Sequence, residues 1–337
     1  MSSSGSPEGI SQLFKELDEI ASELEEERRS HVILLIFHDD AYITREVVDD
    51  LEFFLEKHNL TAVDKNVDVI LHTRGGDADA AYHLGILLQE LMEREGGEDK
   101  KLTFIIPRLA KSAGTLLACS GDEIAMTPIS ELGPVDPQVY VQSSRAWVSA
   151  RVVRDSFGQT LEILREKVLK DAIEIVSKAP GISEAVSSVV KSFTEAALSG
   201  IPVMEFGHYD SLIDHVRSLL IELLSKRMFR KPAQTSGQHK SGNVEEVIEK
   251  IADKLVRGYR YHGKVIHLKE AEDLGLKIHK LSARERELVN SLYMKIRELF
   301  NTIAEIVFPV EIVMGRAPSV TTYQLEHGLI YAPRLEA

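Results

Sequence analysis

The chain has 337 residues, 44% of them hydrophobic, which is enough for one large domain or two smaller ones. Its 53 acidic residues outnumber the 40 basic ones, giving a formal net charge of −13, which argues against nucleic acid as a general partner and against docking on anionic membranes. A single cysteine, Cys119, excludes an intrachain disulfide and a thiolate metal cluster, and it favours a reducing, cytoplasmic location.

The first predicted elements are a tail and a helix. Residues 1–9 are mostly small and polar, which predicts a disordered tail that lacks the features of a signal peptide. Apolar residues then recur at helical spacing from Ile10 to Arg29, which predicts an amphipathic leading helix over residues 10–30. We favour packing of this helix against its own domain over a role in assembly. No apolar run approaches the roughly 18 residues of a membrane span, so stable membrane insertion is not expected.

From residue 31 onward, short apolar runs alternate with helical patterns. Strand-length runs occur at Val32–Phe37, Val67–Leu71, Leu102–Ile106 and Ile124–Met126, and amphipathic helical patterns follow the first two. This alternation predicts an α/β fold with right-handed crossovers.

The second half of the chain is mainly helical in pattern. Arg230–Asn243 reads as a polar loop, Val265–His267 as a short strand, and the tail from Pro309 has no clear period. We therefore predict a core over residues 31–283, followed by a C-terminal helix and tail over 284–337. Helices are predicted at Leu161–Ser177, Glu184–Ala197, Leu212–Met228, Val244–Leu255, Lys269–Leu274 and Arg284–Val307.

Two turns between strands and helices carry the chemical signal. In "LHTRGGDADAAYHLGILL", Gly75 and Gly76 allow a sharp turn whose backbone N–H groups can bind an oxyanion, although a plain tight turn is the commoner explanation. In "KSAGT", Ser112 precedes a predicted helix, where simple capping is the alternative role. Because both turns lie on consecutive strand–helix units, they are expected at the same side of the sheet, where a nucleophile and oxyanion donors can meet.

Three segments in this region resemble the serine dehydrogenase proteinase family, which is related to signal peptide peptidase A and to the proteolytic subunit of Clp. They are "HTRGGDADAA", "AKSAGTLLACSGDEIAM" and "SELGPVDPQ", within a resemblance that covers roughly residues 32–276. The resemblance implies a Clp/crotonase-like ββα superhelix, here with additional C-terminal helices, and endopeptidase chemistry. Arg74 stands where the family usually has proline. The implied site comprises Ser112 as nucleophile and an oxyanion and substrate-binding segment at Gly75, Gly76, Ala113 and Gly114.

The general base is not obvious from the sequence. His262, in "YRYHGKVIHLKEAEDLGL", is the preferred histidine, with His267 less well placed. Lys167 or Lys170 is the alternative, because relatives of signal peptide peptidase A carry a lysine base in this region of the chain. Asp136 can orient a base, or it can simply form a turn between two prolines.

We weigh two main functions. The first is a serine peptidase that acts on a peptide or protein substrate, needs no cofactor, and forms homo-oligomers by analogy with the fold. The second is a catalytically silent scaffold or binding protein, and acyl-CoA chemistry is a weaker third. A metal site around His208, Asp210, Asp214 and His215 is disfavoured because the spacing does not match a familiar zinc helix.

Overall fold

The computed structural model describes residues 7–38, 41–57, 65–93, 99–142, 145–198, 203–230, 242–307, 322–325 and 328–331. It divides into two compact units: unit 1 contains Met1–Val135 and Ser218–Ala337, and unit 2 contains Asp136–Arg217. Most of the predicted N-terminal tail and of the predicted loop at 230–243 lies outside the described residues. Over the described ranges, no helix combines the length and the apolar character that crossing a bilayer requires.

A seven-stranded sheet forms the centre of unit 1, in the order β10-β11-β1-β2-β3-β5-β9. The five strands from β1 to β9 run parallel, whereas β11 is antiparallel to β1 and to β10. Leu34, Ile70, Ile105 and Ala125 are register partners across four strands, and all four are fully buried. The strands are β1 (Ser30–Phe37), β2 (Asn66–His72), β3 (Leu102–Ile106), β5 (Glu123–Met126), β9 (Ile278–Lys280), β10 (Thr322–Leu325) and β11 (Gly328–Tyr331).

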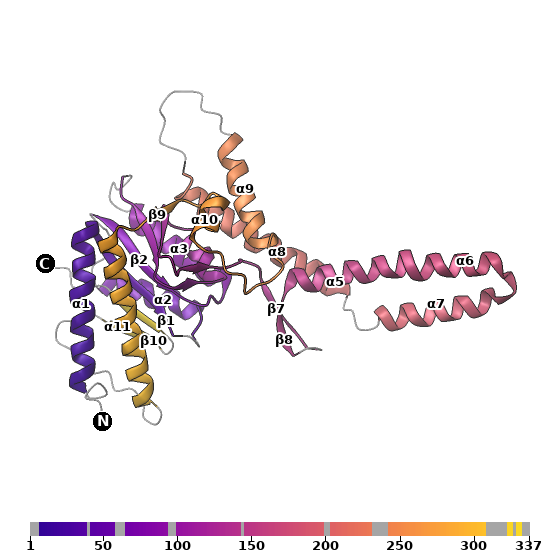
Figure 1. The fold of residues 1–337 in the computed structure, drawn as a ribbon, viewed down its shortest axis with the longest axis horizontal. Helices are drawn as coiled ribbons and strands as arrows, with labels where there is room; N and C mark the ends of the chain where they lie inside the picture. Colours follow the sequence, from indigo (N-terminus) through magenta and orange to yellow (C-terminus); the bar gives the residue numbers. More distant parts are fainter. Residues whose placement is uncertain are drawn as a thin grey trace. The chain divides into compact units, whose positions relative to one another are not determined.

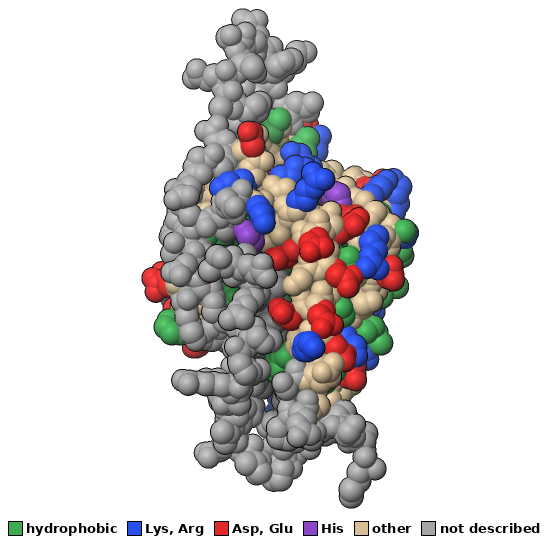
Figure 2. Space-filling view, turned by 90° about the vertical axis from the view of Figure 1, so that its left-hand side faces the viewer, with side chains coloured by type: hydrophobic (Ala, Val, Ile, Leu, Met, Phe, Trp, Pro, Cys, Tyr) green, Lys and Arg blue, Asp and Glu red, His purple; other side chains and the backbone are tan. Residues whose placement is uncertain are grey.

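One face of this sheet is covered by the first and last long helices, α1 (Pro7–Arg28) and α11 (Ala283–Val307), which lie side by side in Figure 1. Their apolar stripes, which include Leu17 and Leu292, share one cluster with the row of strand residues above. The preferred interpretation of the leading helix, packing on its own domain, is therefore confirmed. Figure 2, which views the side on which α1 lies, shows acidic and basic side chains interspersed over the described surface.

The strand residues that alternate with Leu34, Ile70, Ile105 and Ala125 point to the opposite face of the sheet. The crossover helices α2 (Arg45–Lys57), α3 (Ala78–Glu93) and α4 (Ala113–Ala118) follow the parallel strands. Gln89 joins α3 to its neighbours, because its Nε2 donates to the carbonyl oxygens of Ser120 at 2.7 Å and Leu223 at 3.2 Å. The remaining helices of this unit are the second half of α8 (Val203–Lys226), α9 (Gly242–Arg257) and α10 (Leu268–Leu274).

A small second sheet lies at the carboxyl ends of the parallel strands. Its strands β4 (Leu109–Ala110) and β6 (Glu131–Leu132) are parallel, with bridges from Thr73 to Ala110 and from Ile266 to Leu132. The chains of β2, β3 and β5 each leave the main sheet and continue into this one. The predicted strand at Val265–His267 is wrong in extent, since only the isolated bridge at Ile266 forms there.

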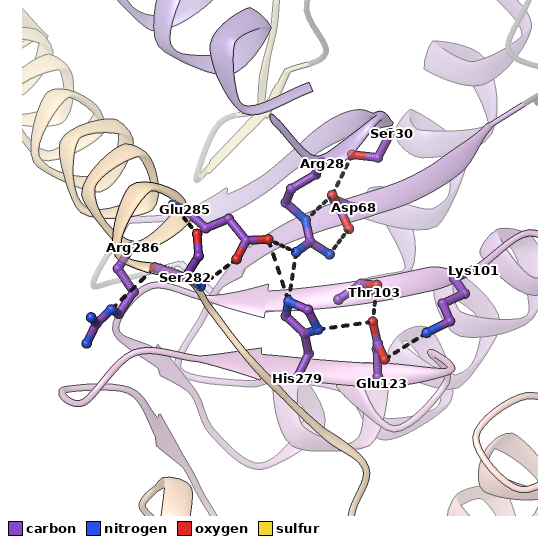
Figure 3. Close-up of polar contacts among 10 residues, drawn as sticks. All are labelled: Arg28, Ser30, Asp68, Lys101, Thr103, Glu123, His279, Ser282, Glu285 and Arg286. Atoms are coloured by element: carbon purple, nitrogen blue, oxygen red, sulfur yellow. Dashed lines mark hydrogen bonds and ion pairs between the residues drawn. The ribbon is translucent and has the colours of Figure 1, made fainter. Parts of the chain in front are cut away.

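A polar cluster lies toward the amino-terminal ends of the same strands (Figure 3). The Arg28 guanidinium donates to Asp68 from two nitrogens, at 2.5 and 3.0 Å, and to Glu285 at 2.5 Å. His279 stands between Glu285 and Glu123, at 3.5 and 3.6 Å. The cluster joins α1, the sheet and the start of α11 into one body.

Unit 2 contains a β-hairpin and a helical hairpin. The strands β7 (Gln138–Val141) and β8 (Ala146–Ser149) pair antiparallel. The first limb of the helical hairpin is α5 (Ala150–Ile163), a π-helical segment (Leu164–Leu169) and α6 (Lys170–Lys178). A 3-10 turn (Pro180–Ile182) leads to the second limb, α7 (Ser183–Leu198). The predicted helices at Leu161–Ser177 and Glu184–Ala197 are thus confirmed.

Candidate active site

Ser112 stands in a strained turn between β4 and α4. Its backbone has φ 50° and ψ −118°, a conformation that costs an L-residue roughly 1–3 kcal/mol. Hydrogen bonds on both sides hold the turn: Lys111 N–H donates to the Thr73 carbonyl at 3.1 Å, and Thr115 N–H donates to the Ser112 carbonyl at 2.9 Å. The side chain of Ser112 makes no capping hydrogen bond to α4, so simple helix capping does not explain this serine.

The glycine turn after β2 packs directly against this serine. Gly75 has φ 111°, and a β-carbon there would lie 2.9 Å from Ser112 Cβ and 2.8 Å from the Lys111 carbonyl oxygen. Gly76 has φ 148°, and a β-carbon there would overlap the Ile43 backbone. Only glycine therefore fits at these positions. The two turns do meet at one side of the sheet.

Two backbone amides remain open beside the serine hydroxyl. Among the described residues, the N–H groups of Gly76 and Ala113 have no hydrogen-bond acceptor. The Gly114 N–H, in contrast, donates to the Lys111 carbonyl at 2.7 Å and is engaged within the turn. Gly76 is exposed and Ser112 is half-buried, whereas Ala113 is buried, so the solvent-facing part of this group is formed by Gly76 and Ser112.

Lys111, the neighbour of the serine, is directed into the small second sheet. Its Nζ lies 2.9 Å from Glu131 Oε2 and donates to the Leu132 carbonyl at 3.0 Å and the Lys264 carbonyl at 3.4 Å. Burial alone would raise the pKa of Glu131, but hydrogen bonds from Arg108 and Lys111 lower it below its ordinary value. Lys111 is therefore committed to an ion pair with Glu131. Sequence reasoning missed the role of Glu131, which only the strand pairing reveals.

The predicted base candidates lie in different parts of the molecule. His262 is a half-buried turn residue of unit 1, and its segment is fixed to the site by Ile266, which exchanges backbone hydrogen bonds with Leu132 at 2.9 and 3.0 Å. His267 caps α10, where its Nδ1 accepts from the Glu270 N–H at 3.4 Å. The other candidates belong to unit 2: Asp136 is buried, whereas Lys167 and Lys170 are exposed on the helical hairpin.

The Ser112 hydroxyl itself has no hydrogen-bond partner within the described part of the chain. Neither a histidine nor a lysine from these residues donates to it or accepts from it.

Comparison with known families identifies the fold. The model of the ClpP-like SDH-type serine proteinases matches residues 8–179, which is just over half of the chain. The chain belongs to this family. The family assignment inferred from the two turns is confirmed, and so is the ClpP-like α/β fold. The match ends inside unit 2, near the tip of the helical hairpin, so the helices from α7 onward extend beyond the matched stretch.

Two individual relatives match part of this chain. Two uncharacterized proteins of Methanocaldococcus jannaschii, MJ1495 and MJ0137, are 35% and 32% identical over 127 and 130 residues. Each match spans about a third of this chain, 35% and 36%, and about two fifths of the relative, 40% and 42%.

Two solved structures of the 1510-N membrane-bound stomatin-specific protease are similar at 14% identity. A serine-to-alanine mutant has a TM-score of 0.37 over 75% of this chain and 79% of its own. A lysine-to-alanine mutant in complex with a substrate peptide has a TM-score of 0.26 over 76% and 95%.

Other reactive groups of the family member do not join the site. Cys119 ends α4 fully buried, and burial raises the pKa of its thiol to about 12, which makes it a core residue. Among the described residues, no three His, Cys, Asp or Glu side chains gather in a way that would hold a metal ion.

Proposed function

We propose that this chain is a serine peptidase that cleaves peptide bonds through an acyl-enzyme on Ser112. One observation carries the proposal: the strained turn at Ser112 lies against Gly75, and the residues that follow each of these two, Ala113 and Gly76, have N–H groups without an acceptor among the described residues. A positive φ at the serine is the backbone arrangement by which a sharp strand-to-helix turn presents a nucleophile.

In the proposed reaction, Ser112 Oγ attacks the carbonyl carbon of the scissile bond while its proton passes to a base. The carbonyl oxygen becomes an oxyanion, which accepts hydrogen bonds from the Gly76 and Ala113 amides. The carbon–nitrogen bond then breaks as the base returns the proton to the leaving amine. A water molecule then attacks the ester carbon while the base takes its proton. The bond to Ser112 Oγ breaks as the base gives this proton to Oγ, which releases the acid and restores the serine.

We assign the base to His262. The support is that this histidine belongs to the same unit as Ser112 and that its segment is hydrogen-bonded to the strand beside the serine turn. Asp136, as an orienting carboxylate, and Lys167, as the alternative base, stay predictions from the sequence. The substrate is a peptide or protein chain, the assembly is a homo-oligomer, and the location is cytoplasmic, in keeping with a single buried cysteine.

The deciding experiment is labelling with a fluorophosphonate probe, followed by peptide mapping. We expect covalent modification of Ser112, loss of labelling in Ser112→Ala, and full labelling in Ser156→Ala, a matched change at an exposed serine of α5. Folded protein that the probe leaves unmodified would favour the silent scaffold instead.

A second comparison tests the base. His262→Gln should lower kcat by at least 100-fold, while Lys167→Met leaves it unchanged. The reverse result would reassign the base to the lysine.

A further inference from the structure

The helical hairpin of unit 2, residues 150–198, carries more exposed apolar surface than its own packing uses. We call this segment the arm. Of its described side chains, only those of Ala150 and Leu164 are buried among the hydrophobic residues. Ile173 is 70% exposed and Val189 is 68% exposed. A pair of helices that buries so little is marginal alone, because helical stability in proteins comes mainly from packing of an apolar face.

The exposed apolar residues follow helical spacing on both limbs. On the second limb, Ile182 of the 3-10 turn and Val189 and Phe193 of α7 are separated by seven and four residues, which places them on one face. On the other limb, Leu161, Leu169 and Ile173 are separated by eight and four residues across the π-helical segment. Each limb therefore has an outward apolar stripe in addition to the side that faces its partner limb.

Charge indicates what covers these stripes. The arm has seven basic and seven acidic residues, so it is neutral, whereas the chain as a whole carries −13. Several of these charges are already paired within the arm, as in Lys178 with Glu174 at 2.5 Å and Lys191 with Glu195 at 3.9 Å. Two copies of the chain repel one another over the rest of their surface and least at the arms. An anionic membrane is a poor occupant, because the arm has no net positive charge to attract it.

The size of the arm fits self-association. Its first limb, Ala150 to Lys178, is about 43 Å long at ~1.5 Å per residue, and two adjacent helices are ~20 Å wide. The resulting face is on the order of the ~800 Å² per partner that stable complexes bury. Two helical hairpins that join through apolar stripes form a four-helix bundle, and a two-fold axis makes one such face complementary to itself.

We propose that the arm docks against the arm of a second copy of this chain and forms a four-helix bundle. The inference rests on the proposed self-association and names its surface, but it does not depend on peptidase activity. The stripes defined above form the centre of the interface, and the charged flanks of the helices form its rim.

The test uses the full chain and measures its mass by light scattering and sedimentation velocity over a concentration series. The variants Val189→Glu and Ile173→Glu place one charge on each stripe, and Ser187→Glu places the same charge on the polar flank of α7 as the matched control. We expect wild type and Ser187→Glu to be dimers or even-numbered multimers, and each stripe variant to weaken association at least tenfold. The far-UV circular dichroism of each stripe variant should be unchanged, because both positions are exposed, whereas the melting temperature should fall by the stabilisation that docking gives the arm.

Three results would overturn the inference. An unchanged mass in both stripe variants would mean that the chain self-associates through another surface than the arm. A monomeric wild type at about 100 µM would contradict both the self-association and its placement on the arm. Cosedimentation of a monomeric chain with phosphatidylglycerol vesicles, lost in Val189→Glu, would assign the stripes to lipid. Probe labelling of Ser112 in the same samples reports on the peptidase proposal separately.

Discussion

Strain at single residues concentrates where Gly75 and Ser112 meet. Ser112 holds a positive φ because the Lys111 and Thr115 amides are bonded on either side of it. Gly75 leaves room for that turn, since any side chain would fall within 3 Å of the Lys111 carbonyl or of Ser112 Cβ. The two residues thus require each other, and a change at one must displace the other.

The first prediction concerns Gly75→Ala. The added methyl group meets backbone at 2.8 Å and forces an L-residue into a left-handed φ of 111°, so we expect destabilisation of roughly 1–3 kcal/mol and at least a 100-fold loss of Ser112 labelling rate. Urea unfolding and probe kinetics measure the two effects. Gly158→Ala in α5 is the control, because its β-carbon would touch nothing within 4 Å and the change should stabilise the helix slightly. Equal behaviour of the two variants would contradict this account.

The meeting of the serine turn with the glycine turn could be predicted because the signals of both turns are local. Paired glycines and a run of small residues indicate turns independently of the rest of the chain. Consecutive strand–helix units bring such turns to one edge of the sheet. The position of His262 relative to Ser112 could not be predicted, because the two residues are 150 apart in the chain and the bridge from Ile266 to Leu132 that fixes the His262 segment has no local signal. The commitment of Lys111 to Glu131 arises from pairing of β4 with β6, which has no sequence signature of its own.

At the scale of elements, α1 is attached to the sheet through two contacts of one acidic side chain, Glu25. Glu25 accepts a hydrogen bond from the Val32 N–H at 2.8 Å and stands 4.0 Å from His31 Nδ1. Burial raises the pKa of Glu25 to about 7, with Asp18 and Asp68 adding to the shift and Lys65 opposing it. The folded state therefore holds a proton on Glu25 that the unfolded chain releases at a lower pH.

The second prediction follows from this sign. The contribution of Glu25 to stability is fully present below about pH 4.5 and is lost as pH rises through about 7, a change of roughly 1–3 kcal/mol. Glu25→Gln keeps an acceptor for Val32 and removes the titration, so its stability relative to wild type should rise across this window. Urea unfolding at a series of pH values measures the difference. A stability difference for Glu25→Gln that does not change with pH would refute the assignment.

The third prediction concerns the Arg28 cluster of Figure 3. Asp68→Asn removes the carboxylate that takes two hydrogen bonds from a nearly buried guanidinium, which should cost about 3 kcal/mol of unfolding free energy. Neutralising Glu19, whose exposed contact to Lys15 spans 3.9 Å, should cost less than about 0.5 kcal/mol. Midpoints of urea denaturation compare the two, and a small effect at Asp68 would mean that Glu285 alone holds Arg28.

The helices and the strands β1, β2, β3 and β5 could be predicted from periodicity, but short pairing elements could not. The strands β10 and β11 fall in the tail that has no clear period, and β9 has only three residues. The hairpin of β7 and β8 exposes Tyr140 and Trp147, which stack edge to face at 5.7 Å, so its pattern lacks a buried face to recognise. Such strands form because a neighbouring edge needs hydrogen bonds, and that need is invisible in the local sequence.

At the scale of the whole molecule, the two units differ in how much apolar surface they bury. Unit 1 has a continuous core on its sheet, whereas the arm of unit 2 has few buried side chains. Regions with few buried contacts open locally at low free energy. The stability of the chain is therefore uneven along its length.

The fourth prediction is that this difference appears in hydrogen exchange. Amides of α5–α7 should exchange at least 100-fold faster than those of β1–β3 in the monomeric Val189→Glu variant, and docking of arms should slow the arm alone in wild type. Mass spectrometry of peptides from both units measures the rates. Equal protection in the monomeric variant would show that the arm is stable without a partner.

The contact between α1 and α11 also has a consequence for biosynthesis. A ribosome finishes α1 long before it reaches α11, and at ~5–20 residues per second the interval is roughly 10–50 s. During that time Leu13, Leu17 and Leu24 on the nascent chain lack the leucines that will cover them. Closure of the core is therefore a late, long-range event. A polypeptide that stalls before residue 283 has an amino-terminal helix with an exposed apolar face, to which chaperones can bind.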